Sequence, residues 1–134
     1  MVSYAVRRPD NHVHLIARAK EGFLMPDIMR DLKKFTSKRL IESILANDQE
    51  SRKEWMLSIF KVSGEYNINN KNYQFWRQDN KPIELWSHDV IQQKLQYIHQ
   101  NPVEAGFVTE AEHWKYSSAI DYSGGKGLLD IVYL

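Results

Sequence analysis

The pattern of apolar and polar positions near the start of the chain predicts two consecutive short strands, over 3–8 and 12–19. The second segment alternates, with His12, His14 and Ile16 on one face and Val13, Leu15 and Ala17 on the other. The Pro-Asp-Asn segment between them is typical of a turn. We therefore expect the chain to begin with two strands joined by a turn.

Apolar side chains spaced by three or four residues predict helices over much of the remaining chain. The spacing over 26–46 is that of an amphipathic helix, and the proline at its start suits a first helical turn. Residues 54–61 could continue helically. A further helix is expected over about 88–100, with Ser87 as its N-cap and Pro102 ending it.

The composition is that of one globular domain, which we assign to residues 1–134. Hydrophobic residues make up 43% and charged residues 26% of the chain. No apolar run approaches the length of a membrane span, and the N-terminus lacks the apolar segment of a signal peptide. We therefore expect a cytoplasmic protein without membrane contact. Cysteine is absent, which excludes disulfides and thiolate chemistry and leaves histidine, carboxylate or amide groups for any metal.

The distribution of charge along the chain is more informative than the net charge. A net charge of +1 and a pI of about 7.9 do not indicate a dedicated DNA-binding domain. The predicted helix over 26–46 nevertheless carries a basic band beside its apolar stripe, formed by Arg30, Lys33, Lys34, Lys38 and Arg39. This band is either a solvated face or a path for a DNA backbone.

The first candidate for chemistry is the pair His12 and His14. Side chains two residues apart on a strand share a face, so both imidazoles are placed to share one cation. An isolated pair of this kind is more often an ordinary half-buried strand face. The pair alone therefore does not assign a metal site.

The second candidate is Tyr97 with Asn101. Positions four residues apart are neighbours on a helix, so a phenol and an amide lie on one face here. Two ordinary roles are also open: Tyr97 as an amphipathic helix residue, and Asn101 as the cap of a following turn with Pro102 and Glu104. His99 points away from Tyr97 on a helix, so we do not assign it as a ligand.

Three segments in this order carry a family resemblance: HVHLI at 12–16, YIHQNPVEAG at 97–106 and WKYSSA at 114–119. Together they resemble the REP-associated tyrosine transposases, a branch of the single-tyrosine HUH transposases. The resemblance extends from about Tyr4 to the end of the chain.

The resemblance implies an α+β fold, namely a ferredoxin-like antiparallel sheet with the HUH strand at its centre and helices packed on it. It also implies a further stretch of chain ahead of the HUH strand, with a first strand additional to the one predicted over 3–8, which this chain lacks, and a homodimer. An unpaired sheet edge would favour such an association.

The resemblance further implies that His12, His14 and Asn101 hold Mg²⁺ or Mn²⁺ while Tyr97 attacks a phosphate of single-stranded or hairpin DNA. The cation would offset the charge of the phosphodiester, and the product would be a 5′-phosphotyrosine with a free 3′-OH. A second 3′-OH could then rejoin strands without ATP. The basic band, from Arg30 to Arg39, is the expected DNA contact.

Two other functions are considered. A catalytically inactive DNA-hairpin-binding protein derived from such an enzyme would bind DNA without cleaving it. A metallohydrolase acting on other substrates is disfavoured, because acidic ligands are missing near His12 and His14.

Overall fold

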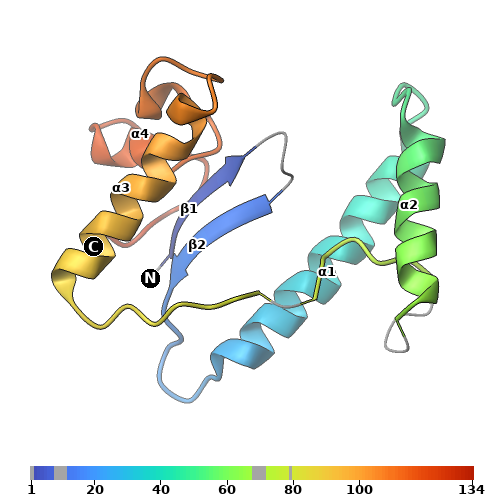
Figure 1. Cartoon of the computed structure of the whole chain (residues 1–134), viewed down its shortest axis with the longest axis horizontal. Coiled ribbons are helices and arrows are strands. Elements are labelled where there is room, and N and C mark those ends of the chain that lie inside the picture. Colours follow the sequence, from blue (N-terminus) through green and yellow to red (C-terminus); the bar gives the residue numbers. More distant parts are fainter. Residues whose placement is uncertain (1, 8–11, 68–71, 79) are drawn as a thin grey trace. The chain divides into compact units, whose positions relative to one another are not determined.

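The computed structural model describes residues 2–7, 12–67, 72–78 and 80–134, which contain both strands and helices, with helices predominating. The chain forms two compact units (Figure 1). The hairpin unit consists of Met1–Glu21 together with Ile83–Leu134, and the helical unit is Gly22–Pro82. The expected mixture of strands and helices is confirmed.

The hairpin unit begins with the two predicted strands, β1 (Val2–Arg7) and β2 (His12–Ala17). They pair antiparallel in a register that places His14 opposite Ala5 and His12 opposite Arg7. The turn predicted at Pro-Asp-Asn lies outside the described residues.

Within the described part of the chain, the sheet consists of β1 and β2 alone. The central position expected for the HUH strand is therefore not seen there, because each strand of a two-stranded sheet has one neighbour. Each strand also has an edge to which another strand could add.

Helix α3 (His88–Glu104) packs against both strands of the hairpin. It begins as predicted, since the Ser87 Oγ accepts a hydrogen bond from the Val90 N–H at 3.3 Å. The buried apolar cluster between α3 and β2 consists of Ile16, Leu95 and Ile98. This packing fixes the face of α3 that is directed toward the hairpin.

The prediction that Pro102 ends this helix is wrong, because α3 continues through Pro102 to Glu104. A proline this close to the end removes a single backbone donor, and the following residues complete the last turn. Gly106 adopts a φ of +75° and donates to the Val103 carbonyl at 2.9 Å, while Phe107 donates to the Pro102 carbonyl at 3.0 Å. These two bonds form a Schellman motif, which closes the helix beyond the proline.

The rest of the hairpin unit folds back along α3. A short 3-10 helix, η1 (Ala111–His113), packs against α3 and against α4 (Ala119–Tyr122). The chain end is tied to α4, since the Leu134 N–H donates to the Tyr122 hydroxyl at 3.1 Å. Figure 1 shows α4 near the later end of α3, while the end of the chain lies beside the earlier half of that helix, where the Gln92 Nε2 donates to the Leu134 carbonyl.

The helical unit contains α1 (Met25–Ala46) and α2 (Lys53–Glu65), which lie side by side (Figure 1). Both predicted helical segments are confirmed, and α2 extends beyond its predicted end. The segment after α2 contacts α1 through Trp76, whose indole Nε1 donates to the Thr36 hydroxyl at 2.8 Å. None of the helices in the described residues combines the length and apolar character needed to cross a membrane.

Candidate active site

Strand β2 directs His12 and His14 toward each other. Their ring centroids lie 4.7 Å apart with the rings perpendicular, and the two Nε2 atoms are 3.0 Å apart. At this distance one neutral ring can donate its Nε2 proton to the other. Both side chains are half-buried. The pair thus presents two nitrogen donors that converge on one point.

Tyr97 approaches this pair from α3. Its ring centroid lies 5.6 Å from that of His14, and the two rings are nearly perpendicular, at 80°. The packing of α3 against β2 therefore brings together side chains that are far apart in the sequence. Tyr97 is 49% exposed, so its ring is supported on one side and accessible on the other.

Asn101 lies one turn beyond Tyr97 on α3 and is almost completely buried, with 2% exposure. Its side-chain Nδ2 donates to the Tyr97 backbone carbonyl at 3.2 Å, which confirms that the two residues share a face of the helix. The role of Asn101 as the cap of a following turn is excluded, because the residue lies inside α3. The amide oxygen is the atom of this side chain that could coordinate a cation.

The spacing of the two imidazole nitrogens is suitable for a divalent cation. In an octahedral site with bonds of about 2.1 Å, adjacent ligand atoms lie about 3 Å apart. The 3.0 Å between the Nε2 atoms of His12 and His14 matches that separation. In the part of the chain that is described, no three His, Cys, Asp or Glu side chains form a metal-binding group. A cation here would therefore need the Asn101 amide and oxygens from the substrate or water.

A second polar cluster lies on another face of α3 and was not predicted from the sequence. The His99 Nε2 and the Ser118 Oγ are 3.0 Å apart, and the His99 ring packs against Tyr122 with centroids 5.2 Å apart. Burial lowers the pKa of His99 below its ordinary value of 6.5. This placement supports the expectation that His99 is not a ligand beside Tyr97. The cluster includes one of the two adjacent serines of the WKYSSA segment, Ser117 and Ser118, which are both fully buried.

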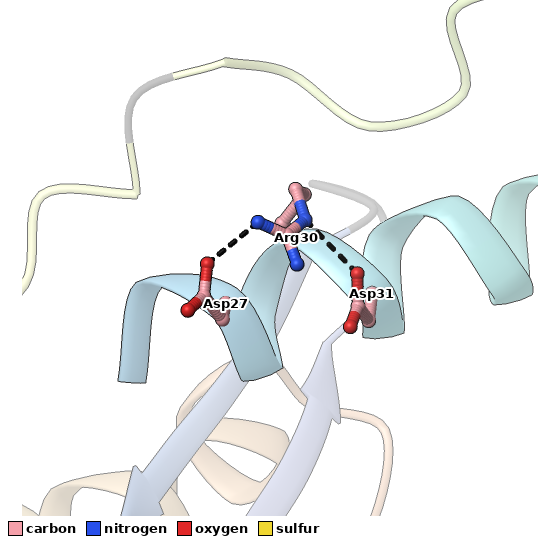
Figure 2. Close-up of polar contacts among 3 residues, drawn as sticks. All are labelled: Asp27, Arg30 and Asp31. Atoms are coloured by element: carbon pink, nitrogen blue, oxygen red, sulfur yellow. Dashed lines mark hydrogen bonds and ion pairs between the residues drawn. The ribbon is translucent and has the colours of Figure 1, made fainter. Parts of the chain in front are cut away.

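The basic residues predicted to contact DNA lie on α1, in the helical unit. Arg30 is held between two carboxylates on its own helix, with its Nη1 2.6 Å from Asp27 and its Nε 2.9 Å from Asp31 (Figure 2). The hydrogen bond to Asp31 is the main cause that raises the pKa of Arg30 above its ordinary value. The Lys33 Nζ donates to the Arg77 backbone carbonyl at 2.7 Å.

Further along α1, Lys38 and Arg39 share one acidic partner. The Arg39 Nη1 lies 3.4 Å from a Glu42 carboxylate oxygen, and the Lys38 Nζ lies 4.0 Å from the other. Within the described residues, Lys34 forms no ion pair and is exposed. Surface ion pairs of this kind contribute about 0–1 kcal/mol, so DNA phosphates could replace the carboxylates as partners.

Comparison of the chain with protein-family models, with curated proteins and with solved structures found no match. A function is therefore inferred from the arrangement of its own side chains.

Proposed function

We propose that this chain is a metal-dependent single-strand DNA transposase or endonuclease of the single-tyrosine HUH class. The observation that carries the proposal is the convergence of three rings from two elements. His12 and His14 of β2 approach within 3.0 Å, and Tyr97 of α3 packs against His14. An exposed tyrosine beside two converging imidazole nitrogens suits nucleophilic attack on a phosphate.

In the proposed reaction, the Tyr97 phenolic oxygen attacks a DNA phosphorus atom in line with the bond to the 3′-oxygen. The phosphorus–O3′ bond breaks, the phenol loses its proton, and the departing 3′-oxygen gains one. The product is a 5′-phosphotyrosine, which keeps the energy of the original diester bond. Attack by another 3′-OH then forms a new phosphodiester and releases Tyr97.

His12, His14 and Asn101 would hold Mg²⁺ or Mn²⁺, which would offset the negative charge of the attacked phosphate. The perpendicular His14 ring limits the orientations available to the Tyr97 side chain. Half of the Tyr97 surface is exposed, which gives a DNA strand access to the phenol.

The proposal includes a homodimer in which a larger ferredoxin-like antiparallel sheet is formed. It is supported by the sheet of the described residues, in which β1 and β2 have only each other as strand neighbours, so that a strand of a second chain could add to it. A monomer mass that stays constant with concentration in analytical sedimentation would contradict this part.

The central test is formation of a covalent adduct between the protein and single-stranded hairpin DNA in the presence of Mn²⁺, observed on a denaturing gel. Tyr97→Phe removes only the phenolic oxygen, so the adduct should vanish while hairpin affinity changes little. Tyr116→Phe is a matched control, because Tyr116 belongs to the same unit and is 47% exposed. An adduct with Tyr97→Phe but not with Tyr116→Phe would show that the nucleophile is misassigned.

The alternative is a catalytically inactive hairpin-binding protein. Tight binding of the hairpin by the unmodified protein, with no adduct at any Mn²⁺ concentration, would establish this alternative.

A further inference from the structure

A pocket of about 430 Å³ lies in the hairpin unit, on a face of α3 other than the one that carries Tyr97. Gln92, Gln96 and Gln100 lie along its floor at four-residue spacing, which aligns them on one side of the helix. Its other walls include His99, Glu112 of η1 and Tyr122 of α4. Every residue of the pocket belongs to one unit, so its shape follows from packing within that unit.

The chemistry of this lining selects for an uncharged ligand with both hydrogen-bond donors and acceptors. A primary amide donates and accepts and carries no charge. Gln92 is already engaged, since its Nε2 donates to the Leu134 carbonyl at 3.1 Å. Gln96 and Gln100 are exposed and line the pocket. The carboxylate of Glu112 accepts hydrogen bonds and repels phosphate, so the pocket suits a base better than a DNA backbone.

The lining adds an aromatic ring to these polar groups. Tyr122 lines the pocket and packs edge to face against both His99 and Tyr133, which limit the motion of its ring. Aromatic rings are the usual partners of unstacked bases in single strands. Glutamine side chains recognise adenine through paired hydrogen bonds, and an acidic side chain accepts from the exocyclic amino group of a base.

We propose that this pocket binds one unpaired nucleobase bearing an exocyclic amino group, from the same DNA strand that Tyr97 attacks. This inference rests on the proposed function. Gln96 directly precedes Tyr97 on α3, so a base held by Gln96 and Gln100 sets the register of the strand relative to the phenol. Thymine has no exocyclic amino group and is the base that the pocket accepts least well.

The first test uses free nucleosides and the full ¹⁵N-labelled chain, with the side-chain amide signals of the glutamines followed by NMR. Adenosine, cytidine and guanosine at millimolar concentration should shift the signals of Gln96 and Gln100, whereas thymidine should shift them less. Gln93 is an internal control, because it is exposed on α3 but does not line the pocket. Equal shifts at Gln93 and Gln96, or none with any nucleoside, would overturn the proposal.

The second test uses hairpin DNA in which each unpaired base is replaced in turn by an abasic site. With the unmodified protein, one such replacement should weaken binding by about tenfold, the effect expected when paired hydrogen bonds to a base are removed. The combined variant Gln96→Ala and Gln100→Ala should lose this discrimination, while Gln93→Ala should keep it. Alanine suits a helix, so these variants should remain folded, as circular dichroism can verify.

The failures of the two proposals differ. If Tyr97 forms its adduct but no abasic position matters, or the double variant discriminates as before, the base pocket is wrong and the nuclease remains. If the protein neither binds nor cleaves DNA, the proposed function is wrong, and the proposed binding of a base in the pocket is wrong as well.

Discussion

The two units of this protein differ in where their polar side chains find partners. In the hairpin unit, two polar contacts involve buried groups: Asn101 is bonded within α3, and Ser118 lies against His99 of that helix. In the helical unit, the ion pairs are on the surface and join residues close in sequence, such as Arg30 with Asp27. The hairpin unit therefore holds polar side chains in fixed positions, as catalysis requires. The basic side chains of the helical unit can exchange their carboxylate partners for other anions.

The apolar side chains show the same contrast. Of the residues in α1 and α2, Ile41 and Gly64 are the buried ones. Three exposed apolar residues lie along α2 at spacings of four and three, Trp55, Ile59 and Val62, and the residue that follows the helix, Tyr66, is exposed as well. We therefore expect a substitution in the hairpin unit to lower the free energy of unfolding more than a comparable substitution in the helical unit.

The largest expected effect is on catalysis. His14→Ala should reduce adduct formation by at least about 100-fold through weaker cation binding, and excess Mn²⁺ should restore part of it. Tyr97→Phe should not recover at any Mn²⁺ concentration, since no cation replaces a nucleophile. Adduct yield measured against Mn²⁺ concentration separates the two. A His14→Ala protein with an unchanged yield would remove the histidine pair from the site.

The second effect is on stability. A Cβ at Gly127 would overlap the Oδ2 of Asp121, a buried carboxylate whose Oδ1 accepts the Gly127 N–H at 2.9 Å. Gly127→Ala should lower the free energy of unfolding by about 2 kcal/mol, measured by urea denaturation. In the helical unit, a Cβ at Gly22 would contact no other atom, so Gly22→Ala is unfavourable only because of the φ of +84°. We expect it to lower the free energy of unfolding by about 1 kcal/mol. Equal losses of unfolding free energy for the two variants would contradict the tighter packing of the hairpin unit.

A smaller effect is expected on DNA affinity. Replacing Lys34 and Lys38 together with alanine should reduce the salt dependence of hairpin binding by up to about 2 in the logarithmic slope, one for each phosphate that is no longer neutralised. The Mn²⁺ dependence of the adduct should not change. Lys61→Ala, on the exposed surface of α2, provides the control. Identical slopes for the double variant and the control would make the basic band of α1 a solvated face.

The smallest effect is on the pH dependence of stability. Burial lowers the pKa of His99 in the folded chain, so between that value and about 6.5 the unfolded chain binds more protons. The contribution of neutral His99 is therefore complete above pH 6.5 and is lost as the pH falls through the folded pKa. In urea denaturation at several pH values, the free energy of unfolding of His99→Gln should fall less with decreasing pH than that of the unmodified protein. A steeper loss of stability for that variant would show that folding raises the pKa of His99 instead of lowering it.

Local patterns predicted the elements well, because their causes are local. The helix over 26–46, the strand of His12 and His14, and the Ser87 cap all follow from side-chain spacing or from one hydrogen bond. The continuation of α3 past Pro102 was not predicted, because it depends on two backbone bonds made by residues beyond the helix.

The site was harder to predict from the sequence. Periodicity places Tyr97 and Asn101 on one face of a helix, but it does not show that this face meets β2. That expectation came from the family resemblance, and the ring contact between His14 and Tyr97 now gives it a geometry. The His99 and Ser118 pair had no periodic signal, since each residue is an ordinary polar residue until the chain folds.

The hairpin unit is built from two stretches of chain with the whole helical unit inserted between them. Joining them closes a long loop, which costs entropy and slows folding, whereas α1 and α2 meet through short-range contacts. We therefore expect the helices to form early in folding and the His14 and Tyr97 contact to form late. During synthesis the two histidines leave the ribosome well before Tyr97 does. Under the proposed function, a nascent chain carries its histidine ligands on β2 long before it carries a nucleophile, so it is unable to cut DNA until α3 has been synthesised and has packed against β2.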